Sequence, residues 1–330
     1  MKLLVIGKEG RIQKYSQDLM PASCDISYVP LGASEEEILN AGQDADFILA
    51  DSIAEVSAYV IEQMPNLKMI HAEGVGFNGI DTEAAKKRKI YVCNCKGINA
   101  AAVAEQAVLL MLGLLRDVCN GDKSVRNGTQ ADTKDAYMSA GNLKELGECT
   151  VGIVGFGDIG RATAKLVRAF GAKVVYYDCF RADAQTEEDC KVTYSDLESL
   201  LTCSDIVSLH VPVLDSTRKM ADAGFFSKMK KGSYFINTAR GELVDGEALL
   251  DAVRRGRIAG AGLDTIEGEP VSADHPILQA EKDVEDKLIF SCHVGGITGS
   301  TFKRGHKIIW SNIKKVSEGE RPDHVVNSWD

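Results

Sequence analysis

The side chains best suited to acid–base chemistry in this sequence are its six histidines, because an unperturbed imidazole changes charge near neutral pH. They are His71, His210, His275, His293, His306 and His324. His293 is the strongest candidate, since it follows an apolar run and precedes Gly295 and Gly296, and glycines at such a point suggest backbone pressed against a ligand. His71 and His210 lie on or beside predicted strands, and we expect them to be core or wall residues.

An arginine and two carboxylates stand at the ends of other apolar runs. Arg240 follows one run, and Asp264 and Glu269 follow the next. Ligands of open α/β sheets bind outside the carboxyl ends of the strands, so these three side chains and that of His293 should face one cleft. Glu267 is a second carboxylate in the same stretch and the alternative to Glu269.

The segment 151–161 has the form of a strand, a tight turn and a helix start, with Gly155, Gly157 and Gly160 at GxGxxG spacing. The first glycine permits the turn, the second lets the backbone approach a pyrophosphate, and the third packs helix against strand. Free N–H groups at the helix start would then bind the pyrophosphate of a dinucleotide.

A carboxylate at the end of the next strand indicates which dinucleotide is bound. Asp178 closes the predicted strand 173–177, 18 residues after Gly160. A carboxylate at this place accepts hydrogen bonds from the adenosine ribose and repels a 2′-phosphate, which predicts NAD as the cofactor. Arg181 lies three residues further on and leaves some use of NADP open. The alternative is that Asp178 only caps the loop.

The elements that would position these residues alternate along the chain as short apolar runs and helix-length amphipathic segments. This pattern is typical of βα units and a parallel sheet, so the sequence predicts the α/β class. The first predicted strands are 2–6, 26–29, 47–50, 68–71 and 90–93, which suggest a small doubly wound unit. The second series is 150–154, 173–177, 206–209, 233–237, 259–263 and 288–291, a full dinucleotide-binding sheet.

Several helices are predicted with more detail. Ser34 and Glu37 have capping-box spacing at the start of helix 34–41. Residues 99–117 form a long apolar helix that could act as a hinge, the polar segment 120–147 is an arm or a loop, and 298–317 is one helix.

Composition excludes several classes of protein. The 330 residues suggest about two domains at roughly 150 residues each. The 38 Lys and Arg against 48 Asp and Glu give a net charge of −10, so neither nucleic acid nor an anionic membrane surface is an expected partner. The apolar runs are too short for a membrane span of roughly 20 residues or for a signal peptide, so the cytoplasm is the expected compartment.

The nine cysteines are an odd number scattered through apolar segments, with Cys93 and Cys95 as the one close pair. No CxxC pair or histidine cluster completes a metal site, so we expect no metal and mostly buried, reduced thiols. Cys179 and Cys292 are expected to be packing residues.

Six separate blocks of the chain resemble the D-2-hydroxyacid dehydrogenase family, which includes D-lactate, hydroxypyruvate, 3-phosphoglycerate and formate dehydrogenases. The blocks are 74–81, 99–105, 210–212 with Thr217, 237–242, 262–264 and 293–298. The resemblance covers nearly the whole chain and implies two doubly wound parallel-sheet domains. They are a flavodoxin-like substrate domain, residues 1–98 plus 297–330, and an inserted Rossmann NAD-binding domain, residues 99–296. It also implies closure about a hinge and a homodimer.

The resemblance implies roles for the candidate catalytic residues in reversible hydride transfer between NADH and a 2-keto acid. His293 would be the acid/base, Glu269 its partner and Arg240 the clamp on the substrate carboxylate and carbonyl. The backbone of Val75 and Gly76 would be a second hold on the carboxylate. These roles agree with the physics, because a carboxylate favours the charged imidazole that protonates an alkoxide, and an arginine stabilises growing negative charge.

A larger set of residues is implied to contact NAD, with Asp264 at the nicotinamide carboxamide. The set is Gly155, Gly157, Asp158, Ile159, Gly160, Asp178, Val211, Pro212, Thr217, Thr238, Ala239, Arg240, Asp264, His293, Gly295 and Gly296.

Departures from the family narrow the substrate. Members that bind 3-phosphoglycerate carry arginines near the substrate loop, whereas Glu73 stands here and would repel a phosphate. Formate-specific members have an amide at the position of Glu269. A small or medium 2-keto acid remains, and hydroxypyruvate, glyoxylate, pyruvate and branched-chain keto acids stay open. The alternatives are a phosphoglycerate dehydrogenase and an NAD-sensing, corepressor-like scaffold of the same fold. The overall negative charge of the chain argues against the scaffold.

Overall fold

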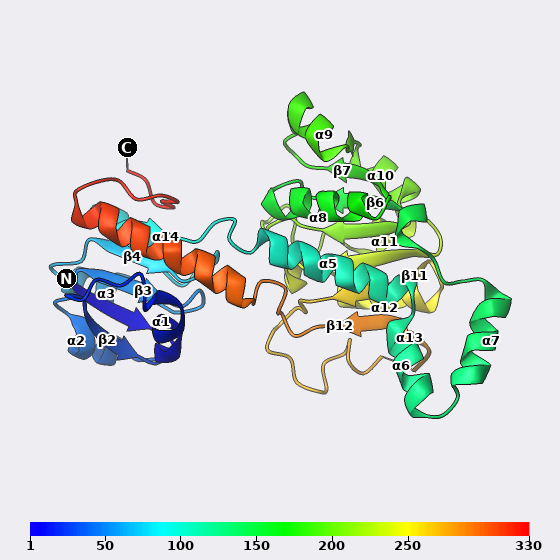
Figure 1. Ribbon diagram of the computed structural model, residues 1–330, viewed down its shortest axis with the longest axis horizontal. Coiled ribbons are helices and arrows are strands. Elements are labelled where there is room, and N and C mark those ends of the chain that lie inside the picture. Colours follow the sequence, from blue (N-terminus) through cyan, green and yellow to red (C-terminus); the bar gives the residue numbers. More distant parts are fainter. Residues whose placement is uncertain (281, 330) are drawn as a thin grey trace. The chain divides into compact units, whose positions relative to one another are not determined.

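The chain divides into two compact α/β units in the computed structural model, which describes residues 1–280 and 282–329 (Figure 1). The five-stranded unit comprises Met1–Asn99 and Ile297–Asp330, and the seven-stranded unit comprises Ala100–Gly296. Every strand pairing within the two sheets is parallel, which confirms the predicted fold class. No helix in the described ranges combines the length and apolar character needed to cross a bilayer.

The five-stranded sheet has the order β2-β1-β3-β4-β5, the order of a flavodoxin-like doubly wound sheet. Its strands are β1 (Lys2–Ile6), β2 (Asp25–Val29), β3 (Phe47–Ala50), β4 (Met69–Ala72) and β5 (Tyr91–Cys93). Its helices are α1 (Glu9–Ser16), α2 (Glu35–Gly42), α3 (Ala58–Gln63), α4 (Thr82–Lys87) and α14 (Gly299–Ser317). Ser34 and Glu37 form the predicted capping box at the start of α2, which confirms the spacing argument.

The last helix, α14, completes the core of this first unit although it comes from the far end of the sequence. Its Ile309, Trp310 and Ile313 are buried in one cluster with Leu3 and Phe47 from the sheet. Figure 1 shows α14 running along the five-stranded sheet, where it contacts α1 and β4. The two ends of the chain therefore share a single hydrophobic core.

The seven-stranded sheet has the order β12-β11-β10-β9-β6-β7-β8, which is the Rossmann order extended by one strand. Its strands are β6 (Thr150–Val154), β7 (Lys173–Tyr177), β8 (Thr193–Tyr194), β9 (Ile206–Leu209), β10 (Ser233–Asn237), β11 (Ile258–Leu263) and β12 (Leu288–Phe290). Its helices are α5 (Ala100–Leu115), α6 (Val118–Arg126), α7 (Gln130–Ala140), η1 (Leu146–Glu148), α8 (Asp158–Ala169), α9 (Ala184–Cys190), α10 (Leu197–Cys203), α11 (Ala223–Lys228), η2 (Gly241–Leu243), α12 (Gly246–Arg254) and α13 (Lys282–Glu285).

The sequence predicted six strands here, and β8 is the one it missed. The strand has two residues, too few to produce an alternating or continuous apolar pattern.

The polar segment 120–147 is a helical arm and not a loop. It contains most of α6, all of α7 and the first two residues of η1, and α7 has no buried residue. Figure 1 shows α7 standing away from the seven-stranded sheet. Because α7 has no buried face, its apolar residues do not recur at helical spacing in the sequence.

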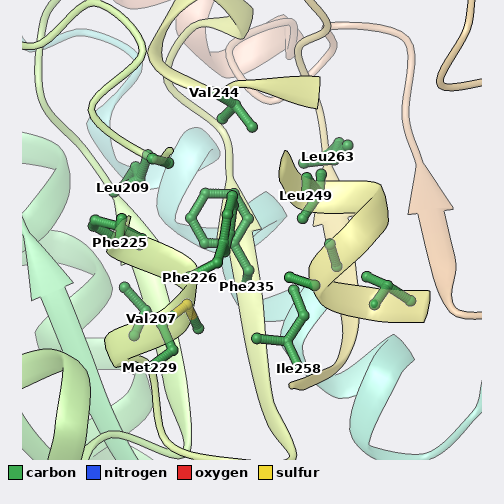
Figure 2. Close-up of a cluster of buried hydrophobic side chains, with 14 of the residues drawn as sticks. Val207, Leu209, Phe225, Phe226, Met229, Phe235, Val244, Leu249, Ile258 and Leu263 are labelled. Carbon is green, nitrogen blue, oxygen red and sulfur yellow. The ribbon is translucent and has the colours of Figure 1, made fainter. Parts of the chain in front are cut away.

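Phenylalanines form the centre of the core between the seven-stranded sheet and helices α11 and α12 (Figure 2). Phe226 packs edge-on against Phe225 and Phe235, at ring-centroid distances of 5.7 and 5.2 Å. Burial of each such ring stabilises the fold by about 1.5–3 kcal/mol. This core fixes β9 and β10, whose carboxyl ends carry candidate site residues.

All nine cysteines are free, and only Cys93, Cys95, Cys149 and Cys190 are buried. Burial raises the pKa of Cys93 and Cys95 to about 12. The expectation of mostly buried thiols is therefore wrong. The packing role expected for Cys179 and Cys292 is also wrong, because both are exposed on loops that follow strand ends.

Candidate active site

His293 lies on the loop after β12 with its imidazole against a carboxylate. Its Nδ1 is 2.7 Å from Oε2 of Glu269, and the other carboxylate oxygen of Glu269 accepts from the backbone N–H of Ile266. The His293 side chain is 46% exposed and that of Glu269 31%, so the pair is open to a ligand. Glu267, the alternative carboxylate, instead lies 3.4 Å from Nζ of Lys219.

Asp264 holds the histidine loop in place. This carboxylate is 2% exposed, and it accepts the backbone N–H groups of Val294 at 3.0 Å and Gly295 at 2.8 Å. The backbone of His293 has a left-handed φ of 55°, and its N–H donates to the carbonyl of Asp264. A Cβ on Gly295 would lie 2.9 Å from Oδ2 of Asp264, so glycine is required for this close approach.

Two polar residues that the sequence analysis missed extend this arrangement. The hydroxyl of Ser291 donates to Oδ1 of Asp264 at 2.5 Å and accepts from Nε2 of Gln106 at 2.9 Å. Gln106 lies on α5, a helix read from the sequence only as apolar, and Ser291 is the residue directly after β12. The signal that could have found Ser291 is its place at a strand end.

Arg240 is exposed just after β10, and the strand end supports its backbone. The Asn237 side chain donates to the carbonyl of Arg240 at 2.8 Å and accepts from the N–H of Ala239 at 3.0 Å. A Cβ on Gly241 would lie 2.1 Å from the backbone nitrogen of Glu267, so this chain segment passes directly beside the turn that carries Glu269. No ion pair engages Arg240 in the part of the chain that the structure describes.

The glycine-rich turn after β6 has the backbone that the sequence predicts. Gly155 has a φ of +95°, and a Cβ there would lie 2.7 Å from the carbonyl of His210. A Cβ on Gly160 would lie 2.1 Å from the carbonyl oxygen of Gly155. Gly157 is the N-cap residue of α8, so no side chain caps this helix. A Cβ at Gly157 would lie in open space. Asp158 and Ile159 form the first turn of α8, whose N–H groups remain available to an anion.

The remaining residues predicted to contact the dinucleotide lie on loops after β7, β9 and β10. Asp178 is half-buried, and its Oδ2 accepts the N–H of Phe156 in the glycine-rich turn at 2.7 Å. The Thr217 hydroxyl donates to the carbonyl of Pro212 at 2.7 Å, which closes the loop that also carries Val211.

Thr238 presents an unpaired polar atom at the same edge of the sheet. Its Oγ1 is buried without a hydrogen-bond partner in residues 1–280 and 282–329, as is Oγ1 of Thr265 after β11. Buried hydroxyls are rarely left unpaired, so both fit contact with a polar ligand group. Together with the open helix start after Gly157, these residues fit a dinucleotide. No group of three His, Cys, Asp or Glu side chains within the described ranges is arranged to hold a metal ion.

The predicted substrate loop follows β4 in the five-stranded unit. Asn94 Nδ2 donates to the carbonyl of Val75 at 2.8 Å, and a Cβ on Gly76 would lie 3.3 Å from the carbonyl oxygen of Ser52. The N–H groups of Val75 and Gly76 have no acceptor among the described residues, so both can donate to a carboxylate.

Glu73, directly before this loop, is a buried and paired carboxylate. Its Oε2 lies 2.6 Å from Arg11, which also contacts Asp51 at 2.6 Å, and its Oε1 lies 3.0 Å from Nε2 of His306. Whether Glu73 repels a phosphate stays a prediction, since its side chain is only 7% exposed and is already paired with Arg11. The sequence around Glu73 does not show that it contacts Arg11 and His306, which lie 62 and 233 residues away.

Two of the other histidines have the structural places expected of them. His71 is fully buried, with Nδ1 2.8 Å from the carbonyl of Ala72 and Nε2 3.1 Å from the Asn312 amide. His210 lies beside β9 with Nε2 2.9 Å from the Ser208 hydroxyl. Burial lowers the pKa of each to about 4.

Comparison with known proteins agrees with this site. Residues 108–295 match the model of the D-isomer specific 2-hydroxyacid dehydrogenase NAD binding domain. The chain is 39% identical to a glyoxylate reductase from Thermofilum pendens over 295 residues, 89% of this chain and 85% of that protein. It is 36% identical to a hydroxypyruvate reductase from Thermotoga maritima over 270 residues, 82% of this chain and 84% of that one.

A solved structure of D-lactate dehydrogenase from Aquifex aeolicus, complexed with NAD and lactic acid, superposes with a TM-score of 0.82 at 27% identity and covers both chains fully. The chain therefore belongs to the D-isomer specific 2-hydroxyacid dehydrogenase family. It is an oxidoreductase, and its cofactor is NAD.

Proposed function

We propose that this protein reduces small 2-keto acids with NADH, with glyoxylate and hydroxypyruvate as the first candidates. The observation that carries the proposal is the 2.7 Å contact between Nδ1 of His293 and Oε2 of Glu269 on a loop that Asp264 fixes. The names of the relatives from Thermofilum pendens and Thermotoga maritima support the substrate class.

His293 supplies the proton. Its Nδ1 is engaged by Glu269, so Nε2 is the nitrogen that can donate to the substrate carbonyl oxygen. NADH, when bound, supplies the hydride to the carbonyl carbon. The Glu269 carboxylate stabilises the imidazolium and holds the ring in one orientation, so a proton is ready for the alkoxide that forms.

Arg240 and the substrate loop hold the keto acid. The guanidinium presents a planar set of donors that can bind carboxylate and carbonyl oxygens together, and its charge lies where negative charge grows. The N–H groups of Val75 and Gly76, which have no acceptor among the described residues, donate to the other oxygen of the substrate carboxylate. The five-stranded unit would thus contribute the substrate loop.

Asp264 and the glycine-rich turn serve the cofactor. Asp264 already accepts three hydrogen bonds, and a carboxylate offers about four acceptor sites, so one remains for the nicotinamide carboxamide. Gly157, Asp158 and Ile159 offer N–H groups to the pyrophosphate, and Asp178 accepts from the adenosine ribose.

The test is steady-state NADH oxidation with glyoxylate, hydroxypyruvate, pyruvate and a branched-chain keto acid, and NAD reduction with D-3-phosphoglycerate. We expect the highest kcat/KM with glyoxylate or hydroxypyruvate. Tight NADH binding without turnover of any of these acids would instead favour the scaffold hypothesis. D-3-phosphoglycerate belongs in the panel because Glu73 is buried and ion-paired with Arg11.

We also propose a homodimer that pairs through the arm of the seven-stranded unit. Val118, Val125 and Met138 on α6 and α7 are 56%, 58% and 72% exposed. Exposed apolar side chains gathered on one arm are typical of an association surface. Light scattering at micromolar concentration tests the proposal, and a monomer would contradict it. Location in the cytoplasm stays a prediction.

A further inference from the structure

The loop after β7 places a cation close to the residue that is proposed to select NAD. Asp178 directly follows β7, and Arg181 lies three residues further along the chain. In dinucleotide sites of this fold, an arginine near the strand end accommodates the 2′-phosphate of NADP. The loop thus combines a carboxylate that repels this phosphate with a guanidinium that could attract it.

The structure shows that the guanidinium is already engaged on the helix that follows the loop. Nε of Arg181 lies 2.9 Å from Oε1 of Glu187, and a terminal nitrogen lies 3.0 Å from Oε2. The guanidinium also lies over the ring of Tyr194, 5.2 Å from its centroid. A two-point contact of this kind is stronger and more directional than a single ion pair.

Glu187 is itself fixed by the sheet. The buried Tyr176 donates its hydroxyl to Oε1 of Glu187 at 2.6 Å, and the same hydroxyl accepts from the N–H of Ala182 at 3.1 Å. The hydrogen bonds from Arg181 and Tyr176 lower the pKa of Glu187 to about 2. The carboxylate is therefore charged at neutral pH and anchored to β7, which starts the cofactor loop.

We propose that Glu187 is a positioning residue for cofactor specificity, because it holds the guanidinium of Arg181 away from the 2′-position of the adenosine ribose. Rejection of NADP(H) then depends on two carboxylates. Asp178 repels the phosphate, and Glu187 withholds the cation that would compensate for it. This inference rests on the role proposed above for Asp178 at the ribose.

The test measures direct binding of NADH and NADPH by fluorescence titration without any keto acid, and then the KM for each in turnover. Four proteins are compared in a series: wild type, Asp178→Ala, Asp178→Ala/Glu187→Gln, and that double variant with Arg181→Ala. We expect Asp178→Ala to narrow the preference for NADH. Glu187→Gln should then tighten NADPH binding by roughly tenfold more and lower its KM with little change in kcat, since one charge-assisted contact becomes available. Arg181→Ala should remove that gain.

Asp189→Asn in the Asp178→Ala background is the matched control. Asp189 lies on the same helix and accepts from Gln185 at 2.9 Å, so its substitution removes a negative charge without touching Arg181. We expect it to leave NADPH binding within twofold. Glu187→Ala serves as a second variant, because an amide at 187 can retain part of the contact, and thermal melting of each variant checks that it folds.

Three outcomes would overturn the role of Glu187: no gain in NADPH binding from either Glu187 variant, a gain that survives Arg181→Ala, or an equal gain from Asp189→Asn. An unchanged NADH preference in the Asp178→Ala single variant would instead overturn the role proposed for Asp178, so the two failures are distinguishable.

Discussion

Nε2 of His306 lies 3.0 Å from Oε1 of Glu73, the residue directly before the proposed substrate loop. The contact joins α14 to the end of β4, and Arg11 binds the other carboxylate oxygen. We expect Glu73→Gln to lower the free energy of unfolding by about 1–3 kcal/mol, because one charge of a buried network is lost. The KM for the keto acid should rise while NADH binding is unchanged.

Glu55→Gln is the control for Glu73→Gln, since Glu55 is exposed and its substitution removes the same charge from the same unit. Urea unfolding and steady-state kinetics measure both effects. Equal KM values in the two variants would show that the network does not position the loop.

The pair of His293 and Glu269 should act as one unit in proton transfer. Glu269→Gln should lower kcat for reduction, because a neutral amide is a weaker hydrogen-bond partner for the imidazole than the carboxylate and orients the ring less firmly. His293→Ala should cost about 10²–10⁴ in kcat, and the double variant little more than that, because the two residues act as one unit. Near-normal reduction by His293→Ala would show that another group delivers the proton.

Arg240→Lys separates charge from geometry in substrate binding. Lysine keeps the positive charge but loses the planar fork that can hold carboxylate and carbonyl together. We expect kcat/KM for the keto acid to fall by about a hundredfold or more, with the Kd for NADH nearly unchanged. A loss of less than threefold would mean that charge alone suffices.

His71 should make the five-stranded unit sensitive to acid. Its two ring nitrogens suit the neutral form, because one donates to the carbonyl of Ala72 and the other accepts from Asn312. Burial lowers the pKa of His71 in the folded state to about 4, against about 6.5 for an unperturbed imidazole, so the unfolded state binds more protons between these values. Stability is therefore lost as pH falls from 6.5 towards 4, by about 2 kcal/mol between pH 7 and pH 5.

His71→Gln should remove most of this pH dependence of the unfolding free energy, whatever its cost at pH 7. His324→Gln, which removes an exposed histidine from the same unit, should change the pH dependence much less, because repulsion from His324 lowers the pKa of His71 less than burial does. Parallel stability curves for wild type and His71→Gln between pH 5 and pH 7 would contradict the prediction.

Buried strands were the most predictable part of the fold. The ranges of β6, β7, β9 and β10 are the same as predicted, because parallel strands buried on both faces read as apolar runs bounded by polar residues. The pattern fails where burial is absent. Helix α7 of the arm has no buried residue, and β8 is too short to show a period.

The candidate site was predictable where residue type and strand end coincide. His293, Arg240 and Asp264 each follow a strand, and parallel strands end at the same edge of a sheet. Partners across the fold were not predictable in this way. Gln106 contacts Ser291, which lies 185 residues further along the chain. The sequence also did not show that the guanidinium of Arg181 binds Glu187 on the following helix. Spacing along a chain carries no information on such contacts.

The shared core of the chain's two ends has a consequence for folding during synthesis. Ala100–Gly296 is one continuous segment, so the seven-stranded unit can fold as soon as it leaves the ribosome. The five-stranded unit lacks Ile309, Trp310 and Ile313 until the last part of the chain is translated, and until then the apolar face formed by Leu3 and Phe47 stays uncovered. The five-stranded unit therefore begins to be synthesised first but completes its fold last. Its exposed apolar face is the part of the nascent protein that a chaperone would protect.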